Sequence, residues 1–296
     1  MSFCWQTWSH VLPFWDTWYL LPSHGWVWLQ WRYSMMTCLF YVTTVIMFKS
    51  TTPSAAHYGD TSLFTGLDTG VSRGVAACAH HKCLYVSDCS DYIHRAELTD
   101  RPSETVMNWS VASYPAGLSV NKAHNVVVAC YDAIKLQEYT THGSLVREIC
   151  LQDDTDPWHA VQLSSGDYVV SQCMSSGMVS VVGVNGQVRR SYGQSQTSDV
   201  GQMKTPLGLA VTKNDDILVA DCDNNRILSM NSSLSSIQEL TLPVDGGIQQ
   251  PCGLCLDESR GRLFVGEYSG SYRLLVFDNV KLMYCNSVSD RIHSRR

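Results

Sequence analysis

The sequence predicts an all-β fold, a β-propeller, from three observations. A sequence unit recurs along the chain, each unit holds short apolar runs separated by polar turns, and 45 % of the 296 residues are hydrophobic. One position marks the five visible units, at Gly74, Gly117, His159, Gly208 and Gly253, so the separations are 43, 42, 49 and 45 residues. Units of roughly 40–50 residues, each built from several strands, are typical of propellers.

The unit over residues 206–230 shows the expected elements most clearly. Leu209 and Val211 alternate with smaller residues, as in a strand with one buried face. The second run is apolar throughout, which suits an inner strand packed between neighbouring blades, so Val219 is expected in the core. Turn-forming residues separate the runs. The four expected strands lie around 209–211 and over 217–220, 226–230 and 237–242.

These residues resemble the NHL repeat, whose pattern is P-x-G-[ILV]-A-[VL], then [IL]-[YL]-V-[AS]-D, then N-x-R-[IV]. The 206–230 unit matches nearly throughout. The units at 73 and 251 match in two strands, and those at 115 and 157 in strand pattern alone. The resemblance implies an NHL-type propeller of six blades. Five are visible, and the sixth would be composite, from 51–69 and 280–296, or incomplete.

The resemblance also implies a binding role. In tripartite-motif NHL proteins the propeller recruits a protein or an RNA, and a separate RING domain carries the ligase chemistry. This sequence shows no RING, B-box or coiled-coil pattern. The expected function is therefore a non-catalytic module that binds a protein or peptide, acting as a monomer. RNA binding is the less favoured alternative, because residues 51–296 carry 19 basic and 26 acidic residues, a net charge of −7.

A metal-dependent enzyme of lactonase or lyase type is the other alternative. The NHL-like amidating lyase needs several histidines that converge on a metal in the central channel, and a zinc site wants three or four ligands. Here only His159 stands at a repeat position that could face inward, and it is expected to be a packed structural residue. The sequence has no P-loop, G-x-S-x-G or H-E-x-x-H motif. We therefore expect no catalytic residue, metal or cofactor.

Acidic residues follow the second run in three units, at Asp88, Asp221 and Glu267, whereas Cys130 and Gln172 stand there in the others. The structural interpretation is a carboxylate that accepts backbone N–H bonds in a tight turn. The functional alternative is a ring of carboxylates around a cation. The first is favoured because two units lack the acid.

The loops after the second runs should share one face, and loops on a rigid scaffold often carry recognition. They include Tyr92, Tyr131 and Tyr268, and exposed aromatic residues are favoured in binding hot spots. These three residues, with Asp221, are the candidate binding residues. The alternative is that each tyrosine covers its own blade.

Ten of the twelve cysteines follow residue 50. Cys89, Cys173 and Cys222 share one repeat position, so their Cα atoms should lie beyond the ~7 Å limit for a disulfide. Free thiols in a reducing, cytoplasmic compartment are expected. The pair Cys252 and Cys255 forms a C-x-x-C inside a strand and is interpreted as structural.

Residues 1–50 are a different kind of sequence, which places the propeller domain at 51–296. Seven of the nine tryptophans lie in the first 31 residues, and none of the stretch matches the repeat. Residues 33–48 form an apolar run between Arg32 and Lys49, shorter than the ~20 residues of a spanning helix. A membrane anchor, a signal peptide and an incorrect gene model or disordered segment all remain open.

Overall fold

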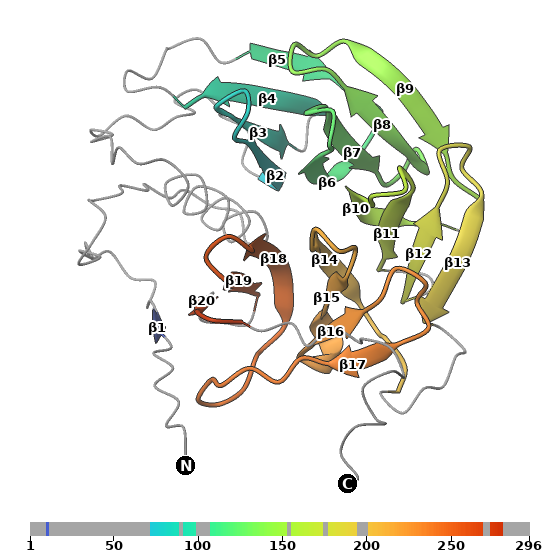
Figure 1. The fold of residues 1–296 in the computed structure, drawn as a ribbon. Helices are drawn as coiled ribbons and strands as arrows, with labels where there is room; N and C mark the ends of the chain where they lie inside the picture. Colours follow the sequence, from blue (N-terminus) through green and yellow to red (C-terminus); the bar gives the residue numbers. More distant parts are fainter. Residues whose placement is uncertain are drawn as a thin grey trace, which may run out of the picture.

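The computed structural model describes residues 10–11, 72–88, 91–98, 107–152, 155–173, 177–193, 201–268 and 273–280. They form five four-stranded antiparallel sheets arranged as blades around an axis (Figure 1). The all-β propeller is therefore confirmed, with five blades in the described part of the chain. The segments 51–69 and 281–296 lie outside the described residues, so a sixth blade stays a prediction.

The first three blades follow the chain in order. Blade 1 contains β2 (Ser72–Cys78), β3 (Cys83–Asp88), β4 (Tyr92–Glu97) and β5 (Met107–Ser110). Blade 2 contains β6 (Pro115–Val120), β7 (Val126–Cys130), β8 (Lys135–Tyr139) and β9 (Leu145–Cys150). Blade 3 contains β10 (Pro157–Gln162), β11 (Tyr168–Gln172), β12 (Met178–Val182) and β13 (Val188–Gly193).

The last two blades differ in where their outer strand comes from. Blade 4 contains β14 (Pro206–Val211), β15 (Ile217–Asp221), β16 (Arg226–Met230) and β17 (Ile237–Glu239), with a short 3-10 turn η1 (Cys222–Asn224) between β15 and β16. Blade 5 contains β18 (Pro251–Asp257), β19 (Arg262–Glu267) and β20 (Leu274–Phe277), and its fourth strand is β1 (His10–Val11). Two residues of the non-repeat segment thus pair with β20.

The first strand of each blade lies nearest the axis, and the fourth lies at the rim (Figure 1). Contacts between successive blades join β2 to β6, β6 to β10, β10 to β14 and β14 to β18. The second strands, which the sequence predicts as inner strands, lie one place further out and are buried almost throughout. The expectation of burial was right, but the axial position belongs to the strand before.

Glycine at the repeat position allows the first strands to approach one another. A Cβ at Gly74 would lie 2.5 Å from the carbonyl oxygen of Ala116, and one at Gly208 would lie 2.7 Å from that of Cys252. The pairing of every first strand with its second strand also shifts register near this position. Such a bulge bends the strand at the axis, where the ring is tightest.

The hydrophobic core lies between blades rather than within them. In β15, Ile217 and Val219 pack with residues of blade 3, whereas Leu218 and Ala220 pack with residues of blade 5. This alternation explains the continuous apolar run, because a strand covered on both faces has no polar side. Val219 is 0 % exposed, which confirms its predicted place in the core.

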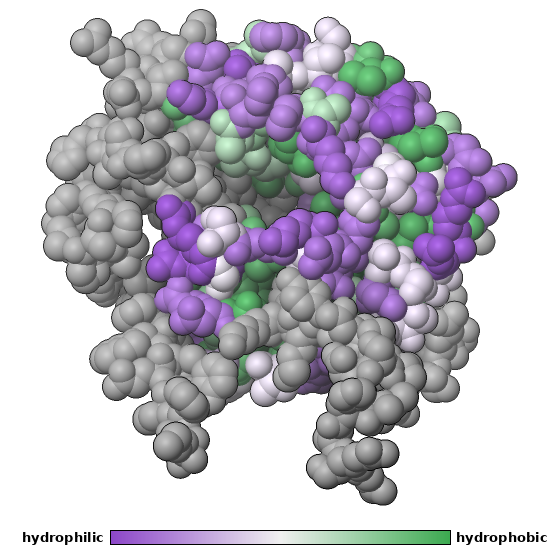
Figure 2. Space-filling model, in the orientation of Figure 1, coloured by the Kyte–Doolittle hydropathy of each residue, from purple (hydrophilic) through white to green (hydrophobic). Residues whose placement is uncertain are grey.

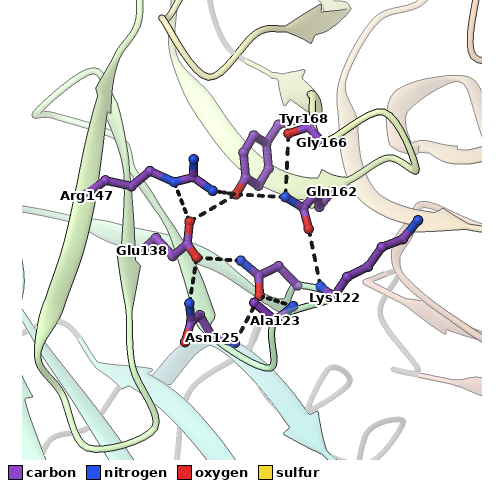
Figure 3. Close-up of polar contacts among 9 residues, drawn as sticks. Lys122, Ala123, Asn125, Glu138, Arg147, Gln162, Gly166 and Tyr168 are labelled. Carbon is purple, nitrogen blue, oxygen red and sulfur yellow. Dashed lines mark hydrogen bonds and ion pairs between the residues drawn. The ribbon is translucent and has the colours of Figure 1, made fainter.

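A polar cluster around Glu138 joins blade 2 to blade 3 (Figure 3). Asn121 and Asn125 each donate to Glu138 Oε1 at 2.7 Å, and Arg147 Nε donates to Oε2 at 2.6 Å. The hydroxyl of Tyr168, from blade 3, donates to the same Oε2 at 3.3 Å. Burial alone would raise the pKa of Glu138, but these hydrogen bonds outweigh it and hold that pKa below its ordinary value.

Candidate binding face

The loops between second and third strands gather at one end of the ring, which we call the loop face. Each begins at the last residue of a second strand: Asp88, Cys130, Gln172, Asp221 or Glu267. All five residues are buried. Figure 2 shows one side of the molecule, where hydrophilic residues cover most of the described surface and hydrophobic residues line the hollow near the axis. Residues 89–90, 174–176 and 269–272 of these loops lie outside the described part.

Asp221 holds the loop of blade 4 in place. Its Oδ1 accepts the backbone N–H of Lys204 at 2.9 Å, and its Oδ2 accepts from Asn224 Nδ2 at 2.7 Å and from Arg226 Nε at 2.8 Å. The carboxylate is 0 % exposed. Asn225 completes the turn with a left-handed φ of 54°. Asp221 therefore lies beneath the surface, and any effect it has on binding would come from holding the loop.

Glu267 and Asp88 repeat this arrangement in blades 5 and 1. Glu267 accepts the backbone N–H of Gln249 at 2.6 Å and Arg273 Nε at 2.6 Å. Asp88 accepts the backbone N–H of Tyr92 at 3.0 Å, and its Oδ2 lies 2.6 Å from His94 Nε2. Asp88 thus accepts a backbone N–H of its own turn, as the structural interpretation predicts. Asp221 and Glu267 instead accept the backbone N–H groups of Lys204 and Gln249, which precede the first strands of their blades. Each of the three acids also pairs with a basic residue after the loop, a partner that sequence reasoning missed.

Blades 2 and 3 stabilise the equivalent loops with neutral groups. The thiol of Cys130 donates to Gln137 Oε1 at 3.4 Å, and Gln172 Nε2 donates to Ser180 Oγ at 3.1 Å. Burial raises the pKa of Cys130 to about 12, so its thiol stays protonated at neutral pH. The last residue of the second strand can therefore be acidic or neutral, provided that its side chain has a hydrogen-bond partner within the blade.

The candidate tyrosines differ in exposure. Tyr92 is 41 % exposed, with its ring centroid 6.5 Å from that of His94. Tyr131 is half-buried and packs against Tyr114, with ring centroids 5.2 Å apart. Burial, followed by the charge of Asp156, raises the pKa of Tyr131. Tyr92 is thus exposed, whereas Tyr131 and Tyr268 are partly buried.

Tyr268 packs on an apolar cluster that spans blades 3 to 5, which we call the cysteine cluster. Its buried members are Cys173, Leu207, Cys222 and Cys252, with Trp158 and Tyr268 packed against them. Burial raises the pKa of Cys173 and of Cys222 to about 12. The eight cysteines of the described residues are free thiols. The cluster therefore acts as an apolar support beneath the loop face.

At the axis, where neighbouring first strands approach closely, His159 replaces the glycine of the other units. Its Nδ1 accepts the backbone N–H of Leu209, in blade 4, at 3.1 Å, and its Nε2 donates to the carbonyl of Leu118, in blade 2, at 3.0 Å. Burial lowers the pKa of His159 to about 4, despite the opposing effect of the Leu118 bond. The ring is neutral at pH 7 and bridges two blades, which confirms its predicted structural role.

Comparisons with known proteins agree with this architecture. The family model of the NHL repeat matches residues 204–228, most of blade 4's first three strands. A search of curated proteins finds no match to this chain. A streptogramin B lyase structure aligns with a TM-score of 0.53 at 15 % identity, over 73 % of this chain and 67 % of that one. A protein of unknown function from Bacteroides caccae aligns with a TM-score of 0.56 at 17 % identity, over 70 % and 78 %.

The WD40 propeller domain of Doa1 also aligns, with a TM-score of 0.50 at 16 % identity, over 72 % of this chain and 80 % of that one. These identities are low, so the likeness concerns the fold alone. The fold and the repeat together define a β-propeller of the NHL-repeat kind. The similar structures include both a lyase and a WD40 domain, and a shared propeller fold does not fix the chemistry.

Residues 33–48, the apolar segment of the sequence analysis, lie outside the described residues. No helix in the described ranges is long and apolar enough to cross a membrane.

Proposed function

We propose that the protein is a non-catalytic binding module that docks a protein or peptide on its loop face. The observation that carries this proposal is the support given to three tyrosines on that face. A hydrogen bond between Asp88 and His94 and an ion pair between Glu267 and Arg273 fix the loops that hold Tyr92 and Tyr268, and the ring of Tyr131 packs against that of Tyr114. Aromatic rings held in place cost little conformational entropy on binding, which favours their use as contacts.

A lyase-type enzyme is the competing function, motivated by the likeness to streptogramin B lyase. That likeness concerns the fold. His159 is the one described histidine that bridges first strands, and both its ring nitrogens are engaged by neighbouring blades. A ring nitrogen in such a bond is not free to accept a proton from a substrate. This arrangement favours the binding role over catalysis at the axis.

The experiment compares partner capture by the wild type and by a Tyr131→Ala, Tyr268→Ala double variant, using proximity labelling in cells. The proposal expects the set of labelled proteins to lose its strongest members in the double variant, while the melting temperature stays within a few degrees. A matched control is Leu145→Ala, Val146→Ala, because these exposed apolar residues lie on β9 at the rim. If the control loses the same partners and the double variant keeps them, binding takes place at the rim.

RNA remains the alternative ligand and needs its own measurement. The net charge of −7 over residues 51–296 gives no overall attraction to phosphate. The test is ultraviolet crosslinking of the chain to RNA. If the chain crosslinks to RNA and the level falls in the tyrosine double variant, RNA replaces protein as the proposed ligand. We also propose a cytoplasmic location, because the described cysteines are all free. Immunofluorescence that places the chain in the secretory pathway would contradict it.

A further inference from the structure

The end of the ring opposite the loop face carries a group of histidines. The turn between β2 and β3 reads Cys78-Ala-His80-His81-Lys-Cys83. The turn between β6 and β7, in the next blade, contributes His124. Neither turn takes part in the proposed binding face. This group needs a separate explanation, because histidines are the commonest metal ligands among side chains.

The rings lie in direct contact across the two blades. His80 and His124 stack with ring centroids 4.1 Å apart and an interplanar angle of 2°. His81 stands edge-on to both, at 4.8 Å from His80 and 5.9 Å from His124. Beneath them, Cys78 Sγ lies 3.4 Å from His81 Nδ1. A thiol and three imidazoles from two blades therefore meet at one place.

We propose that Cys78, His81 and one imidazole of the His80–His124 pair bind a zinc ion between blades 1 and 2. Two ligands of one tetrahedral zinc ion lie about 3.6 Å apart when Zn–S is ~2.3 Å and Zn–N is ~2.0–2.1 Å. The 3.4 Å between Cys78 Sγ and His81 Nδ1 is close to that separation. Thiolate and imidazole are also the ligand types that zinc prefers over oxygen-seeking cations.

The third ligand requires a side-chain movement. Across the ranges that the structure describes, no three His, Cys, Asp or Glu side chains already surround a common point. His80 is exposed and His124 is partly exposed, so either ring can rotate toward the Cys78–His81 pair without repacking the core. Water would complete the tetrahedron. Cys78 and His81 already lie close to the separation of two zinc ligands, and the stacked pair supplies the third ligand.

The protonation states suit a metal ligand. Burial, and then the neighbouring rings of His80 and His124, lower the pKa of His81, so its ring is neutral at pH 7. Zinc would displace the thiol proton of Cys78, which leaves to solvent as the S–Zn bond forms. Arg95 is a positive charge close to His81, and Glu97 accepts hydrogen bonds from both its terminal nitrogens at 3.2 Å. The pairing with Glu97 reduces the repulsion between Arg95 and a bound cation. Lys82 and Lys122 lie in the same two turns, and both are exposed to solvent, which screens their charges.

With His124 as the third ligand, bound zinc would tie the turn of blade 1 to that of blade 2. Since the folded ring holds the ligands close together, the ion would bind it far better than the unfolded chain, and it would raise the melting temperature. The site would then be structural. It leaves the loop face free, so its presence and the proposed partner binding are independent.

The test titrates the full-length, reduced protein with Co²⁺ as a spectroscopic substitute for zinc. We expect one equivalent of Co²⁺ to give the near-ultraviolet thiolate-to-cobalt charge-transfer band, and we expect Zn²⁺ to abolish that band by displacement. Cys78→Ser should remove the band. His81→Gln removes a direct ligand and should weaken zinc affinity at least as much as the ~10–100-fold lost when an outer-shell partner of a metal ligand is removed.

Two further variants make the outcome unambiguous. Cys150→Ser removes an exposed cysteine on β9, far from the ligand turn in sequence, and should keep the band. The double variant His80→Gln, His124→Gln alters only exposed or partly exposed rings and should weaken binding even if Cys78→Ser fails to fold. A band that survives in this double variant and disappears in Cys150→Ser would overturn the proposal. So would the lack of any thiolate band in the wild type.

Discussion

His159 stands where the four other units carry glycine, and its ring makes hydrogen bonds that glycine could not make. It fills the space at the axis and joins β6 to β14 through two hydrogen bonds. Such a bridge has a direct consequence for pH dependence. The pKa of His159 is about 4 in the folded protein and near 6.5 in the unfolded chain.

The folded state therefore binds fewer protons than the unfolded state between those two values. The contribution of His159 is complete above pH ~6.5 and is lost as the pH falls toward ~4, by about 3 kcal/mol in all. We expect the free energy of unfolding of the wild type to fall more steeply over this range than that of His159→Gly. Urea titrations at several pH values measure the difference, since all other groups are common to both proteins. Parallel curves would contradict the buried, neutral ring.

Val219 gives a second test at the level of one residue. Val219→Asp would place a charge among side chains that are fully buried between blades 3 and 4. We expect a loss of several kcal/mol of stability, or failure to fold. Val146→Asp is the control, because Val146 is 47 % exposed and should change the melting temperature little. Equal melting temperatures for the two variants would refute the blade assignment.

At the scale of the element, the loop after the second strand is held by a carboxylate and a basic residue in blades 1, 4 and 5. Arg226→Met would leave the fully buried carboxylate of Asp221 without its cation, at a cost of about 3–5 kcal/mol. The comparison is Arg262→Met, which breaks the Arg262–Asp278 pair on the surface and should cost less than about 1 kcal/mol. Chemical denaturation of both variants is the measurement. Similar losses would mean that the loop does not depend on its ion pair.

The sequence allows much of the element level to be predicted. The third strand of blade 4 begins at Arg226 and ends at Met230, as expected, because turn-forming residues flank a short apolar run. The expected fourth strand over 237–242 is shorter, ending at Glu239. The position nearest the axis and the partners of His159 could not be predicted. Both depend on which blades become neighbours, and periodicity within one unit does not contain that information.

The candidate site, too, could be predicted only in part from the sequence. Repeat position alone predicts that Tyr131 and Tyr268 share a face. Their partial burial depends on Tyr114 and the cysteine cluster, which come from other segments. The ion-pair partners Arg226 and Arg273 follow their acids by five and six residues, a spacing that a search for acid–base pairs across the loop could have found.

At the scale of the whole molecule, residues 1–50 contribute one described element, the strand β1. Deleting them removes β1, a two-residue strand at the outer edge of blade 5, and leaves the apolar cores between blades in place. We expect the truncated chain to keep its β-sheet circular dichroism spectrum. A spectrum of an unfolded chain would show that this segment supplies a larger part of the propeller than two paired residues.

The placement of the cores between blades has a consequence for how the molecule opens. Burial falls from the second strand of a blade to its fourth strand: β7 and β15 are buried throughout, whereas most residues of β9 and all residues of β17 are at least partly exposed. Segments with fewer buried apolar contacts open more readily. Amide protons of β7 and β15 should therefore exchange with deuterium more slowly than those of β9 and β17. Each blade would then fray from its outer strand toward the axis, before the ring as a whole unfolds.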